Sequence, residues 1–92
     1  MDFLVIPAYK PDLTLIHLLQ RVKAKSSLHV VVVNDGSPAS YDSIFQEAQK
    51  YATVLSYMTN QGKGQALKTA FSYIDSLGQY GTVVTADADG QH

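Results

Sequence analysis

Two kinds of apolar periodicity alternate along the chain, and together they predict its elements. Short apolar or β-branched runs predict strands over residues 3–6, 28–33 and 53–58, and a fourth strand after Gly81. Between them, apolar residues spaced three and four apart predict helices. The run from Leu28 to Val33 is almost continuously apolar, which is typical of a strand buried on both faces of a sheet.

The three predicted helices differ in how they begin and end. Asp12 is a candidate N-cap for the first, which Ser26-Ser27 should end. The second is expected over residues 42–51. The third should follow a glycine-rich turn and end at Gly78 as its C′ residue. Its expected inward face consists of Leu67, Ala70, Phe71, Ile74 and Leu77.

The order β-α-β-α-β-α-β predicts an α/β fold with a parallel, Rossmann-like sheet and right-handed crossovers. The 92 residues make one domain at most, or part of one. Composition excludes several classes. A net charge of -1 leaves no basic excess for nucleic acid, and the absence of cysteine excludes a thiolate metal site. The longest apolar runs fall far short of the roughly 20 residues that a membrane helix needs.

Each predicted strand is followed by a polar cluster. The clusters are Pro7-Ala8-Tyr9-Lys10, Asn34-Asp35-Gly36-Ser37, Asn60-Gln61-Gly62-Lys63-Gly64 and Asp87-Ala88-Asp89. In an open parallel sheet the carboxyl ends of the strands form the ligand-binding edge. The four clusters together therefore predict a binding site at one edge, more specifically than any one of them does.

The Asp87-Ala88-Asp89 cluster is the most informative. Residues two apart in an extended segment point the same way, so both carboxylates can face one spot beyond the strand. Two such oxygen donors suit Mg²⁺ or Mn²⁺ carrying a substrate phosphate. An ordinary Asp-Gly turn is the alternative, but the mutual repulsion of two carboxylates favours a cation.

Other polar residues have open interpretations. Asp35 can accept hydrogen bonds from ribose hydroxyls or a base N–H, or can serve turn chemistry. Lys63 and its flanking glycines can bind phosphate at a helix N-terminus, or form an ordinary strand-to-helix turn. Tyr9 can stack on a base or pack against the protein, and His92 is a further candidate contact. Neither a P-loop nor a G-x-G-x-x-G motif is present.

Taken together, the four motifs resemble the amino-terminal, nucleotide-binding half of family 2 glycosyltransferases with the GT-A fold. They are Val5-Ile6-Pro7-Ala8-Tyr9, Val32-Val33-Asn34-Asp35-Gly36-Ser37, Asn60-Gln61-Gly62-Lys63-Gly64-Gln65-Ala66-Leu67 and Asp87-Ala88-Asp89-Gly90-Gln91-His92. They span nearly the whole chain in the family's order. The last block looks most like the polyprenyl-phosphate mannosyltransferase and glucosyltransferase branch.

The resemblance implies roles for individual residues. Pro7 and Tyr9 would border the nucleotide base, Asp35 would bind the base or ribose, and Lys63 would lie near the nucleotide. The remaining residues belong to the last motif: Asp87 and Asp89 would hold Mg²⁺ or Mn²⁺ on the diphosphate, with Ala88 between them and Gln91 in support.

The resemblance also implies partners and a location. The donor would be a nucleotide-diphosphate sugar and the acceptor a polyprenyl phosphate or glycan, at the cytoplasmic face of a membrane, with a membrane partner or anchor. Mannosyltransferase relatives often have an acid where this chain has Pro11, so UDP-glucose is as well supported as GDP-mannose.

A GT-A domain is more than twice this length. We therefore expect residues 1–92 to be the donor-binding part, with the catalytic base beyond His92 and no turnover by this piece alone. Two other classes remain as alternatives: a non-catalytic, flavodoxin-like phosphate-binding or signalling module, and a sugar nucleotidyltransferase. The residues after the first strand, Pro7-Ala8-Tyr9-Lys10, fit neither of them well.

Overall fold

The computed structural model describes residues 1–78 and 81–88, and it confirms the predicted α/β architecture. The elements follow one another along the chain as β1 (Phe3–Ala8), α1 (Leu13–Lys25), β2 (His29–Asp35), the 3₁₀ turn η1 (Ala39–Tyr41), α2 (Asp42–Ala48), β3 (Thr53–Tyr57), α3 (Lys63–Ser76) and β4 (Val83–Thr85).

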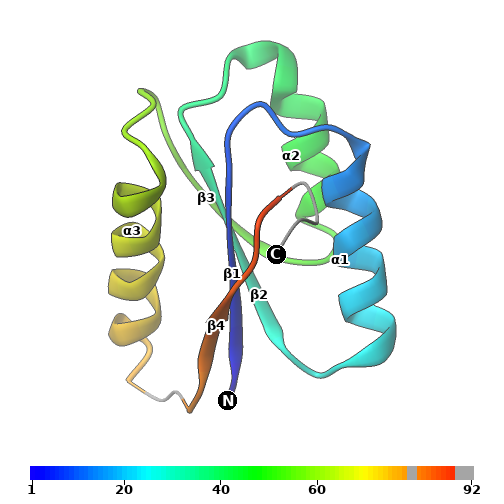
Figure 1. Ribbon diagram of the computed structural model, residues 1–92, viewed down its shortest axis with the longest axis vertical. Coiled ribbons are helices and arrows are strands. Elements are labelled where there is room, and N and C mark those ends of the chain that lie inside the picture. The colour runs from blue at the N-terminus through cyan, green and yellow to red at the C-terminus, as the bar shows by residue number, and fades with distance from the viewer. Residues whose placement is uncertain (79–80, 89–92) are drawn as a thin grey trace.

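The strands form a parallel sheet in the order β3-β2-β1-β4, between two layers of helices. Figure 1 shows α1 and α2 on one face of the sheet and α3 on the other. Side chains of β1 alternate accordingly: Leu4 and Ile6 pack with α1 and α2, whereas Phe3 and Val5 pack with α3. The sheet is therefore buried on both faces at β1 and β2.

Helix α1 begins as the sequence predicts. The carboxylate of Asp12 accepts a hydrogen bond of 2.8 Å from the backbone N–H of Thr14, which satisfies one of the donors left open at a helix start. Gly78 adopts a positive φ of 76° after α3, as expected for a C′ residue.

The inward face of α3 differs from the prediction at three residues, Ala66, Phe71 and Leu77. The buried positions are Ala66, Ala70 and Ile74, while Phe71 and Leu77 are each 44% exposed. Because α3 packs over β1 and β2, the small alanines set the line of closest approach to the sheet. Phe71 lies one residue, or about 100°, off that line and so falls at the rim.

Strand β1 continues through Pro7 to Ala8, so the predicted end of this strand at residue 6, just before Pro7, is wrong. Proline lacks an N–H, which usually excludes it from a central strand. Phe3 and Val5 direct their backbone groups toward β4, and by alternation so does Pro7. Pairing with β4 has ended at Val5, so the missing donor breaks no ladder bond.

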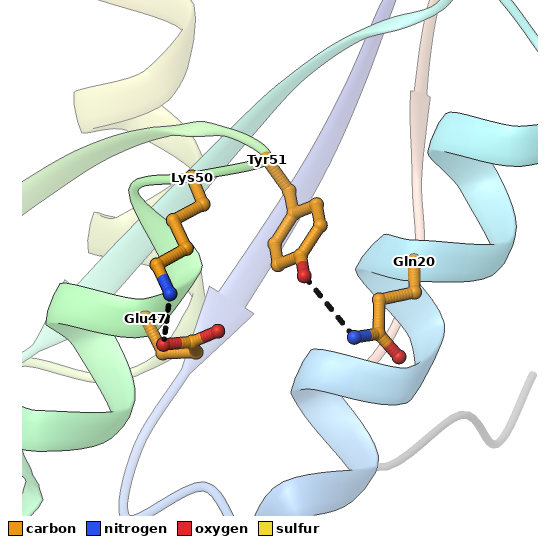
Figure 2. Close-up of polar contacts among 4 residues, drawn as sticks. All are labelled: Gln20, Glu47, Lys50 and Tyr51. Atoms are coloured by element: carbon orange, nitrogen blue, oxygen red, sulfur yellow. Dashed lines mark hydrogen bonds and ion pairs between the residues drawn. The ribbon is translucent and has the colours of Figure 1, made fainter.

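Helix α2 ends at Ala48, three residues before its predicted end. The backbone N–H groups of Tyr51 and Ala52 both bond to the carbonyl of Ala48, which makes a tight turn into β3. Figure 2 shows that the Tyr51 hydroxyl accepts a hydrogen bond of 3.1 Å from Gln20 of α1, next to an ion pair of 2.9 Å between Lys50 and Glu47. The hydrogen bond from Gln20 ties the turn to α1, whereas the Lys50–Glu47 pair lies between the end of α2 and the turn that follows it.

The other boundaries shift by one or two residues. Strand β2 continues through Asn34 to Asp35, two residues beyond the predicted strand 28–33, and β3 ends at Tyr57, one residue before the predicted end. No helix within residues 1–78 and 81–88 is long and apolar enough to cross a membrane.

Candidate functional site

The parallel sheet brings the predicted polar clusters to one edge. All of its strands run the same way, so the turns after β1, β2 and β3 and the residues after β4 lie at the carboxyl edge, uppermost in Figure 1. The backbone geometry therefore gathers residues that are far apart in the sequence. Asp89, Gln91 and His92 lie outside the described residues.

Asp35, at the end of β2, is the centre of the polar network at this edge. The residue is 4% exposed, and each of its carboxylate oxygens accepts two hydrogen bonds. Oδ1 accepts from the hydroxyl of Tyr57 at 2.6 Å and the backbone N–H of Gln61 at 2.9 Å. Oδ2 accepts from Asn60 Nδ2 at 2.9 Å and the backbone N–H of Gly62 at 3.0 Å.

This network also fixes the protonation state of Tyr57. Burial raises the pKa of the Tyr57 hydroxyl, and the hydrogen bond to Asp35 and the charge of that carboxylate raise it further. Tyr57 therefore stays a hydrogen-bond donor at physiological pH. Asp35 and Tyr57 are direct partners in the β2–β3 register, so the pair is set by the sheet itself.

Gly36 lets the turn after β2 touch the turn after β3. Its φ is +70°, and a Cβ atom there would lie 2.1 Å from the backbone nitrogen of Asn60 and 2.3 Å from the carbonyl carbon of Thr59. Both the positive φ and the close approach of two backbones require glycine. Within the same turn, Asn34 Oδ1 accepts a hydrogen bond of 2.9 Å from the N–H of Ser37.

Lys10 connects the turn after β1 to the turn after β2. It has a positive φ of 50°, uncommon for a residue other than glycine, and its backbone N–H donates to Ser37 Oγ at 2.9 Å. Its Nζ lies 5.3 Å from the centre of the Tyr9 ring, within reach of a cation–π interaction. Tyr9 is 47% exposed and so presents much of its side chain to solvent.

Lys63 and Asp87 meet at the same edge from α3 and from the segment after β4. Lys63 Nζ lies 3.3 Å from Asp87 Oδ1, with the two side chains 62% and 47% exposed. An exposed ion pair of this kind contributes only about 0–1 kcal/mol to stability. Its significance is positional, because it places a cation and a carboxylate side by side at the carboxyl edge.

A hollow of about 380 Å³ opens beside Asp87. Its lining residues are Tyr9, Lys10, Pro11, Asp12, Asp87 and Ala88. This volume is within the range of about 300–1,000 Å³ that is usual for small-ligand sites. An aromatic ring, a cation and carboxylates thus surround one space next to Lys63.

The described residues alone do not form a complete metal centre. Within residues 1–78 and 81–88 there is no group of three or more potential His, Asp or Glu ligands. Asp87 is one hard oxygen donor at the hollow. That donor chemistry suits Mg²⁺, which usually binds one or two protein carboxylates and completes its shell with phosphates and water. The predicted pairing of Asp87 with Asp89 lies outside the described residues.

Sequence reasoning missed the residues that organise the site. The sequence pattern assigns Tyr57 no role beyond a place in the predicted strand 53–58, and Asn60 only a place in a glycine-rich turn. A signal was present: Tyr57 lies near the end of the predicted strand 53–58, and Asp35 lies just after the neighbouring predicted strand 28–33. The polar residues Asn60-Gln61-Gly62 follow Tyr57 closely in the sequence. Lys10 gave no comparable signal, because its contact is made by a backbone N–H.

Comparisons with known proteins give the family of the chain. The model of a family described as "Glycosyl transferase family 2" matches residues 3–92. Among curated proteins, the chain is 29% identical over 92 residues to "Uncharacterized protein MJ0544" of Methanocaldococcus jannaschii, covering 96% of this chain and 40% of that protein. It is 32% identical over 95 residues to "Uncharacterized protein MJ1222" of the same organism, covering 98% of this chain and 36% of that protein.

The chain thus spans well under half the length of these relatives, and no solved structure matches it significantly. The family match covers almost every residue, and the parallel α/β sheet is consistent with the N-terminal part of the GT-A fold. The chain belongs to glycosyl transferase family 2.

Proposed function

We propose that the protein is the donor-binding part of a glycosyltransferase. The donor is a nucleotide sugar of the UDP-glucose or GDP-mannose type, and the acceptor is a polyprenyl phosphate or a glycan. Family membership supports the reaction class. The proposal rests on one observation: Lys63 pairs with Asp87 beside a hollow that Tyr9 lines. The lysine is suited to phosphate, the aspartate to a metal ion and the tyrosine ring to a base.

The donor would lie across the carboxyl edge of the sheet. Pro7 and Tyr9 border the base, and Lys63 approaches the phosphates from the start of α3. The half-exposed ring of Tyr9 is suited to stacking on a base, since every base presents an aromatic face. Lys63 is suited to phosphate because its ammonium group is a compact charge at the start of a helix.

The diphosphate end of the donor is assigned to the segment after β4. Asp87 and Asp89 would hold Mg²⁺ or Mn²⁺, with Ala88 between them and Gln91 in support. When bound, the metal would neutralise charge on the departing nucleoside diphosphate. Lys63 forms an ion pair with one carboxylate oxygen of Asp87. In the bound state the ammonium group of Lys63 would also contact the donor's phosphates, and the carboxylate of Asp87 would also contact the metal.

Among the residues proposed to bind the sugar donor and described by the structure, Asp35 makes the most side-chain hydrogen bonds within the protein. A direct bond to the base or ribose stays a prediction, and the hydrogen bonds that it makes favour an indirect role. For the whole protein, we place the reaction at the cytoplasmic face of a membrane, where a polyprenyl phosphate acceptor would lie.

A calorimetric titration of UDP and of GDP into this chain, with and without Mn²⁺, tests the donor site. We expect one of the nucleotides to bind in the presence of Mn²⁺, and to bind at least about tenfold more weakly to Asp87→Ala, a loss of about 1.4 kcal/mol. Asp75→Ala is the matched control, because Asp75 is an exposed acid of α3 outside the hollow, and it should leave binding unchanged.

Binding that ignored both Mn²⁺ and the loss of Asp87 would contradict the metal-linked donor site. A folded chain that bound neither nucleotide would contradict the proposal that these residues suffice for donor binding. Circular dichroism of each variant shows whether it remains folded.

A further inference from the structure

The carboxylate of Asp35 is fully used within the protein. An ionised carboxylate offers about four lone-pair positions, and four donors occupy them here. Three of the donors belong to consecutive residues, Asn60, Gln61 and Gly62. Asn60 Nδ2 also reaches the backbone carbonyl of Asp35 at 3.1 Å, so the turn after β3 is tied to the end of β2 at several points.

The turn that Asp35 holds leads directly to Lys63. Gly62 is the N-cap residue of α3, with a φ of 93°, and Lys63 is the first residue of the helix. The start of α3 has no side-chain cap, so its position depends on the turn before it. A shift of Gly62 would move the Cα of Lys63 and, with it, the ammonium group that lies 3.3 Å from Asp87.

The close approach of Gly36 gives an independent sign that the two turns act as one unit. The absence of a side chain at Gly36 lets its backbone touch Thr59 and Asn60. The turn after β3 is thus held by the Asp35 carboxylate and by contact with the backbone beside it.

We propose that Asp35 is a positioning residue: it binds the turn of residues 60–62 and thereby places Lys63 next to Asp87 for contact with the donor phosphates. The inference rests on the proposed function and refines it. A direct bond from Asp35 to a ribose hydroxyl or base N–H requires the carboxylate to give up one of its present partners. The positioning role requires no such exchange.

Hydrogen exchange of the Gln61 and Gly62 amides, without nucleotide, tests the first half of the inference. We expect these amides to lose protection in Asp35→Asn, because the amide side chain turns an NH₂ group toward donors that need an acceptor. Asp75→Asn removes an exposed carboxylate elsewhere and should leave both amides protected. Unchanged protection in Asp35→Asn would overturn the inference, whether or not the chain binds nucleotide.

A double-mutant cycle on nucleotide affinity tests the second half. We expect Asp35→Asn to weaken Mn²⁺-dependent binding on the order of tenfold, the loss that follows when a charge-assisted hydrogen bond no longer holds the turn. In that background Lys63→Ala should cost less than about twofold more, because the lysine is already misplaced. Lys68→Ala, an exposed lysine of the same helix, is the control. Fully additive losses would overturn the positioning role and indicate a direct contact.

Two milder variants keep the test valid if Asp35→Asn does not fold. Tyr57→Phe and Asn60→Ala leave the carboxylate in place and remove donors from it. If Asp35 positions the turn, both variants weaken nucleotide binding. If Asp35 contacts the donor directly, freeing a lone pair leaves binding unchanged or tightens it, and that result would contradict the inference. A wild-type chain that binds no nucleotide refutes the proposed function, and the exchange experiment still decides whether Asp35 holds the turn.

Discussion

Replacement of Gly36 by alanine should be among the most damaging single-methyl changes in this chain. The new Cβ would lie 2.1 Å from the nitrogen of Asn60 and 2.3 Å from the carbonyl carbon of Thr59. Both atoms belong to the backbone, so no side-chain rotation can relieve the overlap. The turn after β3 must move, and the hydrogen bonds from residues 60–62 to Asp35 must lengthen or break.

The size of the effect follows from three contributions. An alanine at a φ of +70° costs about 1–2 kcal/mol in backbone strain, partly offset by about 0.4–1 kcal/mol because alanine restricts the unfolded chain. Loss of one charge-assisted hydrogen bond to Asp35 adds about 1.5–3 kcal/mol. The sum is a destabilisation of about 1.5–4.6 kcal/mol, with a central value of about 3 kcal/mol.

Two other glycines separate strain from steric overlap. Gly78 has a φ of +76° but open space around its Cβ position, so Gly78→Ala should cost about 1 kcal/mol, for strain alone. Gly64 lies in the first turn of α3 with neither a positive φ nor a neighbour within 4 Å. Gly64→Ala should stabilise the protein by about 0.5 kcal/mol, as in other helices.

Urea denaturation of the three variants, followed by circular dichroism, measures the free energy of unfolding. The expected order of stability is Gly64→Ala, wild type, Gly78→Ala and then Gly36→Ala, with similar m values for all. If Gly36→Ala were no less stable than Gly78→Ala, the turn after β2 would not be in backbone contact with the turn after β3. That result would refute the role of Gly36 in joining the two turns at the candidate site.

Two further predictions concern pH. Because the pKa of Tyr57 is raised in the folded chain, the unfolded chain releases this proton first as pH rises, so the stability that Tyr57 contributes is lost above about pH 10, by at most about 1.4 kcal/mol per pH unit. The difference in unfolding free energy between wild type and Tyr57→Phe should therefore be constant below about pH 10 and shrink above it. A difference that stayed constant above that pH would contradict the raised pKa. The hydrogen bond from Thr14 lowers the pKa of Asp12, so its N-cap contribution is present at neutral pH and is lost as pH falls through the lowered value. Asp12→Ala should accordingly lower the melting temperature at pH 7 but not in strong acid, whereas Asp12→Asn, which keeps an acceptor, should resemble wild type at pH 7; equal losses at both pH values would count against the cap.

Most of the fold could be predicted from the sequence, because buried strands and amphipathic helices each show a characteristic spacing of apolar residues. The apolar runs at Phe3–Ala8 and His29–Asp35 are strands covered on both faces, and Asp12 starts α1 as its residue type indicates. The errors arise where tertiary contacts override local pattern. Pro7 is tolerated within β1 only because β4 is short, and Phe71 is exposed because alanines set the approach of α3 to the sheet.

The candidate site was predictable in its location but not in its internal connections. The rule that ligands bind at the carboxyl ends of parallel strands needs only the order of the elements, so it identified the edge and the polar turns. Which side chain bonds to which depends on strand register and on the path of each turn. The pairing of Asp35 with Tyr57 follows from the β2–β3 register, and periodicity does not specify register in a run as uniformly apolar as Val30 to Val33.

These connections change how an acidic residue at a ligand-binding edge should be interpreted. Asp35 ends β2 and Asp87 follows β4 at the same edge of the sheet, and the sequence indicates a direct contact with the donor or its metal for both. Asp35 is 4% exposed and has four hydrogen-bond donors from the protein. The side chain of Asp87 is 47% exposed and, among residues 1–78 and 81–88, forms an ion pair with Lys63. The exposed carboxylate of Asp87 can offer oxygen lone pairs to a metal or a ligand. The buried carboxylate of Asp35 accepts hydrogen bonds from residues 60–62, which lead directly into Lys63. The two acids are therefore expected to contribute to one site in different ways, one through contact with the donor's metal and the other through the position of the neighbouring cation.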